Sequence, residues 1–228
     1  MNIPKHIGII LDGNRRFARS KNLPIFEGHR LGFENLKKIA QHAFDKGVKI
    51  LTVYAFSTEN WHRDKKEVSY LLNLFKLLVN KEINLLIKNG VKVNFFGRIS
   101  DFDSGLQKSI KNALEKSRNG DKGILNICLS YNGRDEIIRA VKKIIESGIT
   151  ADEVTEDLVN KNLDSAGLPD PDMIIRTSGE QRLSGFLTWQ SIYSEFYFPK
   201  KYWPEFTTAD FDLALEEYNK RRRRYGVD

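Results

Sequence analysis

Short apolar segments alternate along this chain with longer segments of helical periodicity, and this alternation limits the possible folds more than any other feature. Helical patterns over residues 32–47, 66–90 and 134–148 each close on a glycine, a residue that commonly ends helices. Alternation of this kind predicts an α/β fold, in which a central parallel sheet is flanked by helices on both faces. The expected strands are β-branched or aromatic and mostly apolar on both faces, as buried parallel strands are, and they span residues 6–11, 49–56, 91–97, 124–131 and 172–177.

The chain is predicted to form a single domain, residues 1–228. No internal repeat, low-complexity linker or Pro/Gly-rich joint divides it, and 228 residues with 40% hydrophobic content can bury one sizeable core. The only cysteine, Cys128, excludes an internal disulfide framework, and no early segment has the length or flanks of a signal peptide. Since no apolar run approaches the roughly 20 residues that cross a bilayer, we expect a cytoplasmic protein whose membrane contact is limited to the surface.

Basic residues outnumber acidic ones, with 37 Lys and Arg against 30 Asp and Glu, which gives a formal net charge of +7. Such a surplus favours anionic partners. Charge alone does not distinguish nucleic acid, lipid headgroups and small phosphates, so particular residues must decide among them.

The stretch "IILDGNRRFARS", residues 9–20, places an acid, a glycine, an amide and two arginines directly after the first expected strand. Asp12 would repel a phosphate unless a divalent cation lay between them, so the stretch suggests a metal-bridged phosphate. Ligands of parallel α/β sheets bind at the carboxyl ends of the strands. Polar residues also follow the second, fourth and fifth expected strands, and each is by itself compatible with an ordinary loop: residues 57–61, 131–134 and 177–180.

Two phosphate grips are predicted at this rim. After Asp12, the sequence can begin a helix whose free amides face a diphosphate, with Arg16 adding charge and His29 and Arg63 as further donors, although either of the last two is equally compatible with an exposed position. Arg176, Arg182 and Ser184 can hold a second phosphate group by the fork geometry of guanidinium groups.

Glu195 lies eleven residues beyond Ser184, inside an aromatic run that is expected to be core. A buried carboxylate needs a partner. That partner is either an arginine of the same segment, residues 176–198, or a metal shared with Asp12.

The predicted helix over residues 66–88 carries more apolar surface than one face of a sheet requires. A stripe of this kind is ordinarily core, and it can instead line an apolar tunnel. Its members are Val68, Leu71, Leu72, Phe75, Leu78 and Ile83.

Four stretches, "HIGIILDGNRRFARS", "YAFSTENWHR", "YNGRDEI" and "DMIIRTSGEQRLSGFLTWQSIYSEFYF", resemble in order and spacing the cis-prenyltransferases, the undecaprenyl diphosphate synthase family. The similarity extends from His6 to Gly226. It implies condensation of isopentenyl diphosphate with an allylic (geranyl, farnesyl or geranylgeranyl) diphosphate to form a Z-polyprenyl diphosphate, with Mg²⁺ and usually as a homodimer. It also implies a parallel sheet flanked by helices that enclose a hydrophobic tunnel.

The resemblance assigns roles residue by residue. It makes Asp12 and Asn60 catalytic, Asp12 as the magnesium ligand with support from Glu195, and Asn60 near the proton that leaves isopentenyl diphosphate. The residues assigned to the allylic substrate are Gly13, Asn14, Arg15, Arg16, Phe17, His29, Ser57, Thr58, Glu59, Trp61 and Arg63. Those assigned to isopentenyl diphosphate are Arg176, Arg182, Leu183, Ser184 and Arg224, the last reaching across the dimer.

The chain departs from the family pattern at three places. Residues 15–17 read Arg-Arg-Phe where many bacterial members have Gly-Arg-Trp, Ile25 replaces a basic residue, and Gln181 replaces a histidine beside the metal. Because of these changes, the resemblance does not specify the product or the full set of metal ligands.

Two other functions fit parts of the sequence. The basic stretch "KRRRRYG", residues 220–226, is compatible with a nucleic-acid-binding protein, although the resemblance predicts diphosphate substrates and no nucleic acid. A non-catalytic partner subunit of a prenyltransferase is also compatible, but Asp12 and the full Glu-Asn-Trp triplet favour an enzyme. For such an enzyme we expect peripheral contact with a membrane when the product is released. The Asp-Asp-x-x-Asp repeats of trans-type synthases and the P-loop sequence are both absent.

Overall fold

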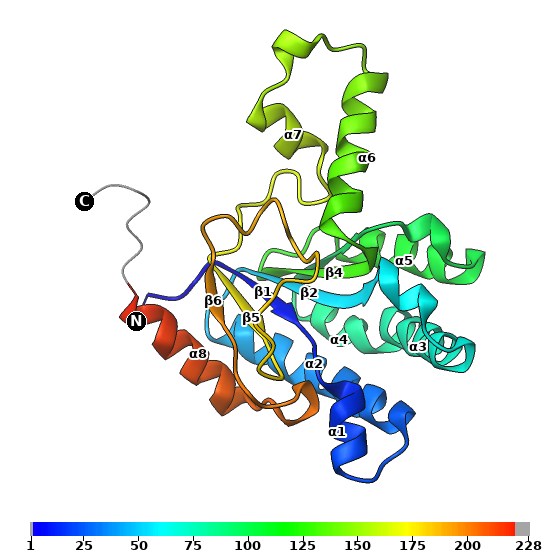
Figure 1. Ribbon diagram of the computed structural model, residues 1–228, viewed down its shortest axis with the longest axis vertical. Helices are drawn as coiled ribbons and strands as arrows, with labels where there is room; N and C mark the ends of the chain where they lie inside the picture. The colour runs from blue at the N-terminus through cyan, green and yellow to red at the C-terminus, as the bar shows by residue number, and fades with distance from the viewer. Residues whose placement is uncertain (1, 222–228) are drawn as a thin grey trace.

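A six-stranded parallel sheet forms the centre of the protein (Figure 1), as described by a computed structural model for residues 2–221. The strand order is β3-β4-β2-β1-β5-β6, and every neighbouring pair runs parallel. This confirms the predicted α/β fold. The strands are β1 (His6–Ile10), β2 (Ile50–Ser57), β3 (Val91–Phe96), β4 (Gly123–Tyr131), β5 (Met173–Arg176) and β6 (Glu195–Tyr197).

The helices follow the predicted alternation. They are α1 (Asn14–Ser20), α2 (Ile25–Asp45), α3 (Lys65–Leu77), α4 (Ile83–Lys88), α5 (Ser104–Ser117), α6 (Gly133–Glu146), α7 (Glu156–Asn162) and α8 (Thr208–Lys220). The helix expected over residues 66–90 is a run of α3 and α4 joined by a π-helical turn, Leu78–Glu82. The predicted terminator Gly90 has a φ of 84°, a left-handed conformation that glycine adopts without a steric penalty.

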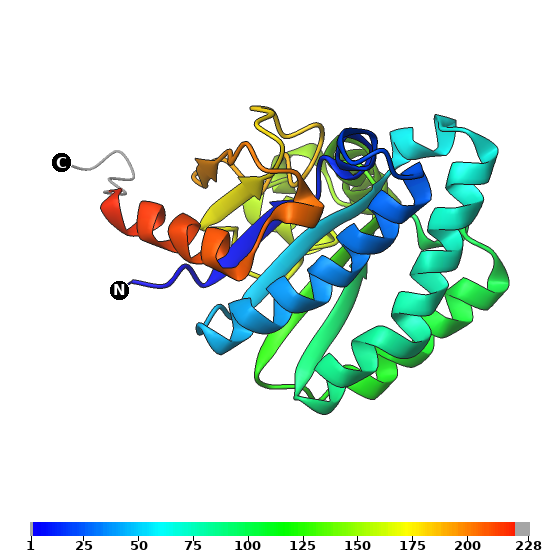
Figure 2. The ribbon, with the colours of Figure 1, turned by 90° about the horizontal axis from the view of Figure 1, so that it is seen from below.

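One face of the sheet carries the main core. Figure 2 shows α2, the α3–α4 run and α5 side by side along this face, and α8 packs beside α2. Alternate residues of the strands point into this layer, among them Ile7 and Ile9 of β1 and Leu51 and Val53 of β2, all fully buried. Since this face is almost wholly apolar, burial of hydrophobic surface is the main source of its stability.

The other face of the sheet has a smaller apolar cluster and a row of buried polar side chains. Phe186 and Leu187, from the segment between β5 and β6, cover the apolar part. His6 accepts a hydrogen bond at Nε2 from the Thr52 hydroxyl (2.7 Å) and donates from Nδ1 to the Pro169 carbonyl (2.7 Å). Burial lowers the pKa of His6 to about 4, so the imidazole is neutral at pH 7.

The elements α6 and α7 pack on each other and extend away from the sheet at the top of Figure 1. Within residues 2–221, none of the helices combines the length and apolar character that a transmembrane span requires.

Candidate active site

A cavity of about 1210 Å³ opens at the carboxyl ends of the strands. Its polar rim comes from the segments that follow β1, β2, β4 and β5, as the position of the ligand site in parallel sheets predicts. Its apolar wall comes mainly from α2 and α3. The large apolar side chains of that wall are Phe33, Leu36, Leu71, Leu74, Phe75 and Leu78.

Asp12 lies at this rim, held between two arginines. Its Oδ1 accepts from Arg16 Nη2 at 3.0 Å, and its Oδ2 accepts from Arg176 Nη2 at 2.8 Å. Partial burial raises the pKa of Asp12, but the hydrogen bonds and charges of Arg176 and Arg16 outweigh it and lower the pKa below its usual value. The Asp12 backbone is also fixed, because its carbonyl accepts from Thr177 Oγ1 at 2.7 Å. The carboxylate is therefore ionised and well oriented.

Gly13 turns the chain from β1 into α1. Its φ is 106°, and a Cβ there would lie 2.8 Å from the ring of Tyr202, so both conformation and space require glycine. Asn14, Arg15 and Arg16 then line the cavity, whereas Phe17 is buried and does not line it.

The helices α1 and α2 touch through two further glycines. A Cβ on Gly28 would lie 2.2 Å from the Asn14 carbonyl oxygen, and one on Gly32 would lie 2.1 Å from Asn14 Oδ1. The backbones of the two helices are therefore in direct contact beside the cavity.

The predicted second grip is only partly assembled. Arg176 Nη1 donates to Ser184 Oγ at 2.8 Å, and Leu183 and Ser184 line the cavity. The Arg182 guanidinium is instead exposed and paired with Glu180, whose Oε1 also accepts from Arg16 at 2.6 Å. Glu180 thus connects the two predicted grips.

The loop after β2 contributes Ser57, Thr58, Glu59 and Asn60 to the cavity lining. Asn60 Oδ1 accepts from the Ser57 amide at 3.2 Å, and this contact caps the beginning of the 3-10 turn Thr58–His62. Trp61 points elsewhere, because its Nε1 donates to Ser130 Oγ at 2.9 Å and its ring packs edge-on against Phe56. It does not line the cavity, so its position does not support its assignment to the allylic substrate.

His29 and Arg63 line the cavity and share one buried carboxylate, that of Glu67 on α3. Sequence reasoning missed Glu67. The available signal was its spacing, since Glu67 follows Arg63 by four residues and immediately precedes Val68, the first member of the apolar stripe.

Glu195 and Asp12 of the same chain lie at opposite ends of the sheet. It starts β6 opposite Met173, which in turn pairs with Ile7 near the start of β1, whereas Asp12 follows the end of β1. Its Oε2 accepts from Arg221 Nη1 at 2.9 Å. A strand parallel to β5 begins at the end of the sheet opposite to the cavity, so the expected metal shared by Glu195 and Asp12 of one chain is not found. The arginine partner of Glu195 is Arg221, which lies outside the expected range of residues 176–198. Arg224 lies outside the described residues.

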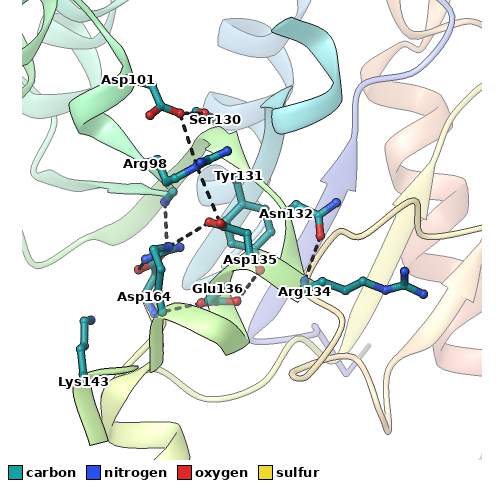
Figure 3. A network of polar contacts seen from close by, with 12 residues as sticks. Arg98, Asp101, Ser130, Tyr131, Asn132, Arg134, Asp135, Glu136, Lys143 and Asp164 are labelled. Carbon is teal, nitrogen blue, oxygen red and sulfur yellow. Dashed lines mark hydrogen bonds and ion pairs between the residues drawn. The ribbon is translucent and has the colours of Figure 1, made fainter. Parts of the chain in front are cut away.

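Several cavity residues were assigned no role from sequence. They follow β3 and β4 or belong to the segment after β5: Arg98, Asn132, Arg134, Asp135, Gly185 and Thr188. Arg98 lies between Asp101 (3.4 Å) and Asp135 (3.7 Å), as Figure 3 shows. Arg98 directly follows Gly97, the last residue of the third expected strand, and this was the signal available in the sequence.

Comparison with known proteins agrees with this geometry. Residues 10–226 match the prenyltransferase family described as undecaprenyl diphosphate synthase, and the chain belongs to that family. It is therefore an enzyme of the cis-prenyltransferase class.

Curated relatives and a solved structure are similar over nearly their full lengths. The isoprenyl transferase of Clostridium perfringens is 45% identical over 98% of this chain and 90% of its own, and that of Thermotoga maritima is 44% identical over 99% and 98%. Lavandulyl diphosphate synthase from Lavandula x intermedia, solved in complex with dimethylallyl diphosphate, has a TM-score of 0.95 and 33% identity, covering 98% of both chains.

Proposed function

We propose that this prenyltransferase condenses isopentenyl diphosphate with an allylic diphosphate of the geranyl, farnesyl or geranylgeranyl type, using Mg²⁺, to form a Z-polyprenyl diphosphate. One observation carries the proposal: the polar rim with Asp12, Arg16 and Arg176 continues directly into the apolar wall of the same cavity. A substrate with a diphosphate head and a hydrocarbon tail matches both parts. The complex of the lavandulyl diphosphate synthase with dimethylallyl diphosphate supports an allylic diphosphate here.

The residues at the rim fit Mg²⁺. This ion is commonly bound by one or two carboxylates together with substrate phosphates and water. Asp12 supplies an ionised carboxylate at the rim, and residues 2–221 contain no group of three or more His, Cys, Asp or Glu side chains placed to enclose a metal. Asp12 would therefore hold the ion against the diphosphate, where Mg²⁺ supplies positive charge that stabilises the leaving group.

The first grip consists of Arg16, His29 and Arg63, which line the cavity around the beginning of α1. Their donors offset the negative charge that grows on the departing allylic diphosphate. The apolar side chains of α2 and α3 keep water from the reacting carbon, so the isopentenyl double bond is the nucleophile that reaches it.

The second grip consists of Arg176, Ser184 and the Leu183 backbone segment, with Arg182 turning inward from Glu180 to meet the isopentenyl diphosphate. Asn60, on the loop after β2, lines the same cavity and orients the isopentenyl group from which a proton leaves. Its amide is held for this purpose by the contact with the Ser57 backbone.

We further propose that the enzyme works as a homodimer in the cytoplasm, with Arg224 of each subunit reaching the isopentenyl diphosphate of the other and with peripheral membrane contact at product release. Mixing Arg224→Ala with Asp12→Ala protein tests the shared site. A mixed dimer places both lesions in one site and leaves the other intact, so activity should recover; no recovery despite demonstrated subunit exchange would remove this arrangement.

The direct test incubates the protein with Mg²⁺, radiolabelled isopentenyl diphosphate and each allylic primer in turn, then sizes the products and determines their double-bond geometry. We expect elongated products with Z double bonds, and loss of turnover on chelation with EDTA. Failure to elongate any of the three primers would contradict the proposal.

A further inference from the structure

Glu67 lies behind the cavity wall at the point where three basic side chains of that wall meet. Its side chain is 6% exposed and does not line the cavity. Oε1 accepts from His29 Nε2 at 3.1 Å and from Arg63 Nη1 at 3.0 Å, and Oε2 lies 3.7 Å from Arg15 Nε. These partners come from α2, from the residue that ends the 3-10 turn after β2, and from α1, so one carboxylate joins three separate elements.

The Glu67 carboxylate offsets the mutual repulsion of the Arg15 and Arg63 guanidinium groups. Burial lowers the pKa of Arg63 and the charge of Arg15 lowers it further, whereas Glu67 raises it. Two guanidinium groups at one partly buried wall repel each other, and each gains hydration by turning outward. With Glu67 between them they face the cavity together, and each retains N–H donors for a ligand because the guanidinium group has five.

The same contact selects the protonation state of His29. Burial lowers the pKa of His29, the contact with Glu67 opposes this effect, and the charges of Arg63 and Arg15 lower it further. These three charged groups act on His29 from α3, from the residue that ends the turn after β2, and from α1. A neutral imidazole in contact with a carboxylate through Nε2 carries its proton there, so Nδ1 is left as an acceptor. An acceptor cannot bind a phosphate oxygen until it is protonated.

We propose that Glu67 is a positioning residue, which holds Arg15, His29 and Arg63 as one preformed diphosphate grip and fixes the His29 proton on Nε2, so that diphosphate binding draws a second proton onto Nδ1. This inference rests on the proposed function, because it takes a diphosphate as the ligand of the cavity. Arg15, Arg63 and Glu67 together carry one net positive charge, and proton uptake by His29 adds another when the anion arrives.

Calorimetric titration with inorganic diphosphate and Mg²⁺ tests the inference. Titrations in buffers of different ionisation enthalpy give the number of protons taken up on binding, and His29→Gln protein corrects for protons taken up by the diphosphate itself. We expect greater uptake by the wild type than by His29→Gln. Glu67→Gln should bind diphosphate about tenfold more weakly, the effect of losing a hydrogen-bonded charge, and should lose the additional uptake.

Kinetics provide an independent readout. Glu67→Gln should raise KM for the allylic substrate about tenfold and change kcat less, and the double variant with His29→Gln should lose less affinity than the two single effects combined. Glu82→Gln is the matched control, because it removes an ion pair with Lys37 from the same helical run without touching the cavity. It should retain wild-type affinity and KM.

The outcomes separate the two proposals. A wild type that elongates allylic diphosphates and binds diphosphate, with Glu67→Gln matching it in affinity and proton uptake, overturns the role of Glu67 alone. A lower melting temperature of Glu67→Gln with unchanged affinity also overturns it, because the role would then be purely structural. A wild type that neither binds diphosphate nor elongates a primer overturns both.

Discussion

The rim around Asp12 and the network around Arg139, of which only Asp135 and Arg98 also line the cavity, use the same residue types in opposite ways. Asp135 and Asp164 belong to the network of Figure 3. Arg139 binds Asp164 through both terminal nitrogens, at 2.7 and 2.6 Å, and donates from Nε to Asp135 at 3.0 Å. At the rim, Arg16 instead divides its two terminal nitrogens between Asp12 and Glu180 and remains over one third exposed. The first arrangement leaves little capacity for a ligand, whereas the second keeps charge accessible to one.

The carboxylates of the two regions differ in the same sense. Glu136 is buried and bonded to neutral donors, the Tyr131 hydroxyl, Gln190 Nε2 and the Asp164 amide, and burial raises its pKa. Asp12 faces two guanidinium groups that lower its pKa. A buried carboxylate with neutral partners, such as Glu136, joins segments of the fold. An ionised carboxylate at a cavity rim, such as Asp12, is available to a cation. We therefore expect the network to stabilise the folded protein and the rim to take part in the reaction.

The largest expected effect is at the rim. Asp12→Ala should lower turnover by about a thousandfold or more, because it removes the proposed ligand of the ion that stabilises the leaving diphosphate. Product formation from radiolabelled isopentenyl diphosphate measures the loss, and circular dichroism checks that the protein stays folded. Near-normal turnover would show that Asp12 takes no part in the reaction, and the proposed difference between the rim and the network would be wrong.

The corresponding change in the network should act on stability. Arg139→Ala should lower the free energy of unfolding by about 3 kcal/mol, because it leaves the partly buried Asp164 without its cation and leaves Asp135 with only the longer contact to Arg98. Urea denaturation measures the change, with Lys161→Ala as the control, since its ion pair with Asp157 is exposed and should contribute less than about 1 kcal/mol. If Arg139→Ala lowered kcat per folded molecule as much as Asp12→Ala does, the network would not act on stability alone, and the comparison with the rim would be refuted.

His6 tests whether polar groups remote from the cavity act only on stability. Its pKa is lowered from 6.5 to about 4 in the folded state, so only the unfolded chain binds a proton between these values. The stability present above pH 6.5 should fall by up to about 3 kcal/mol as the pH drops toward 4. The variant His6→Gln, compared with the wild type by urea denaturation at pH 7 and pH 4.5, should show a weaker dependence on pH; an equal dependence would assign it to other groups.

The smallest expected effect is a change of product, with little change in rate or stability. Ala55 lines the cavity, so Ala55→Leu should shorten the products, and Leu71→Ala should lengthen them by enlarging the same space. Chromatographic sizing of the products measures both shifts. Leu85→Ala, on the same helical run but 64% exposed, is the control and should leave the distribution unchanged. If Leu71→Ala only loses stability, the apolar wall is ordinary core.

The sequence predicts well what depends on local pattern. The five expected strands are found because their apolar runs are flanked by turn residues, and Asp12, Asn60 and Arg176 meet at one cavity because parallel strands place their carboxyl ends on one edge. The three residues of β6 are too few to show a pattern, and the π-helical turn Leu78–Glu82 uses residues that suit an α-helix equally well.

The failures concern partners that are distant in sequence. Glu195 pairs with Arg221 rather than joining Asp12, because its position depends on where β6 begins along β5. Trp61 is next to Asn60 in the chain but on the opposite side of a 3-10 turn, and Glu67 is hidden in a helix as one charge among several. Spacing along the chain specifies neither the Glu195 contact nor the Trp61 contact, and for Glu67 it indicates only the pair with Arg63, not those with His29 and Arg15.

The glycine contact between α1 and α2 fixes how closely the cations at the mouth of the cavity can lie. Gly28 lies against the Asn14 carbonyl oxygen and Gly32 against Asn14 Oδ1, so a methyl group at either position would push the two helices apart. Arg15 and Arg16 follow Asn14 on α1, and His29 follows Gly28 on α2. Two residues without a side chain therefore set the spacing of the charged groups around the cavity mouth.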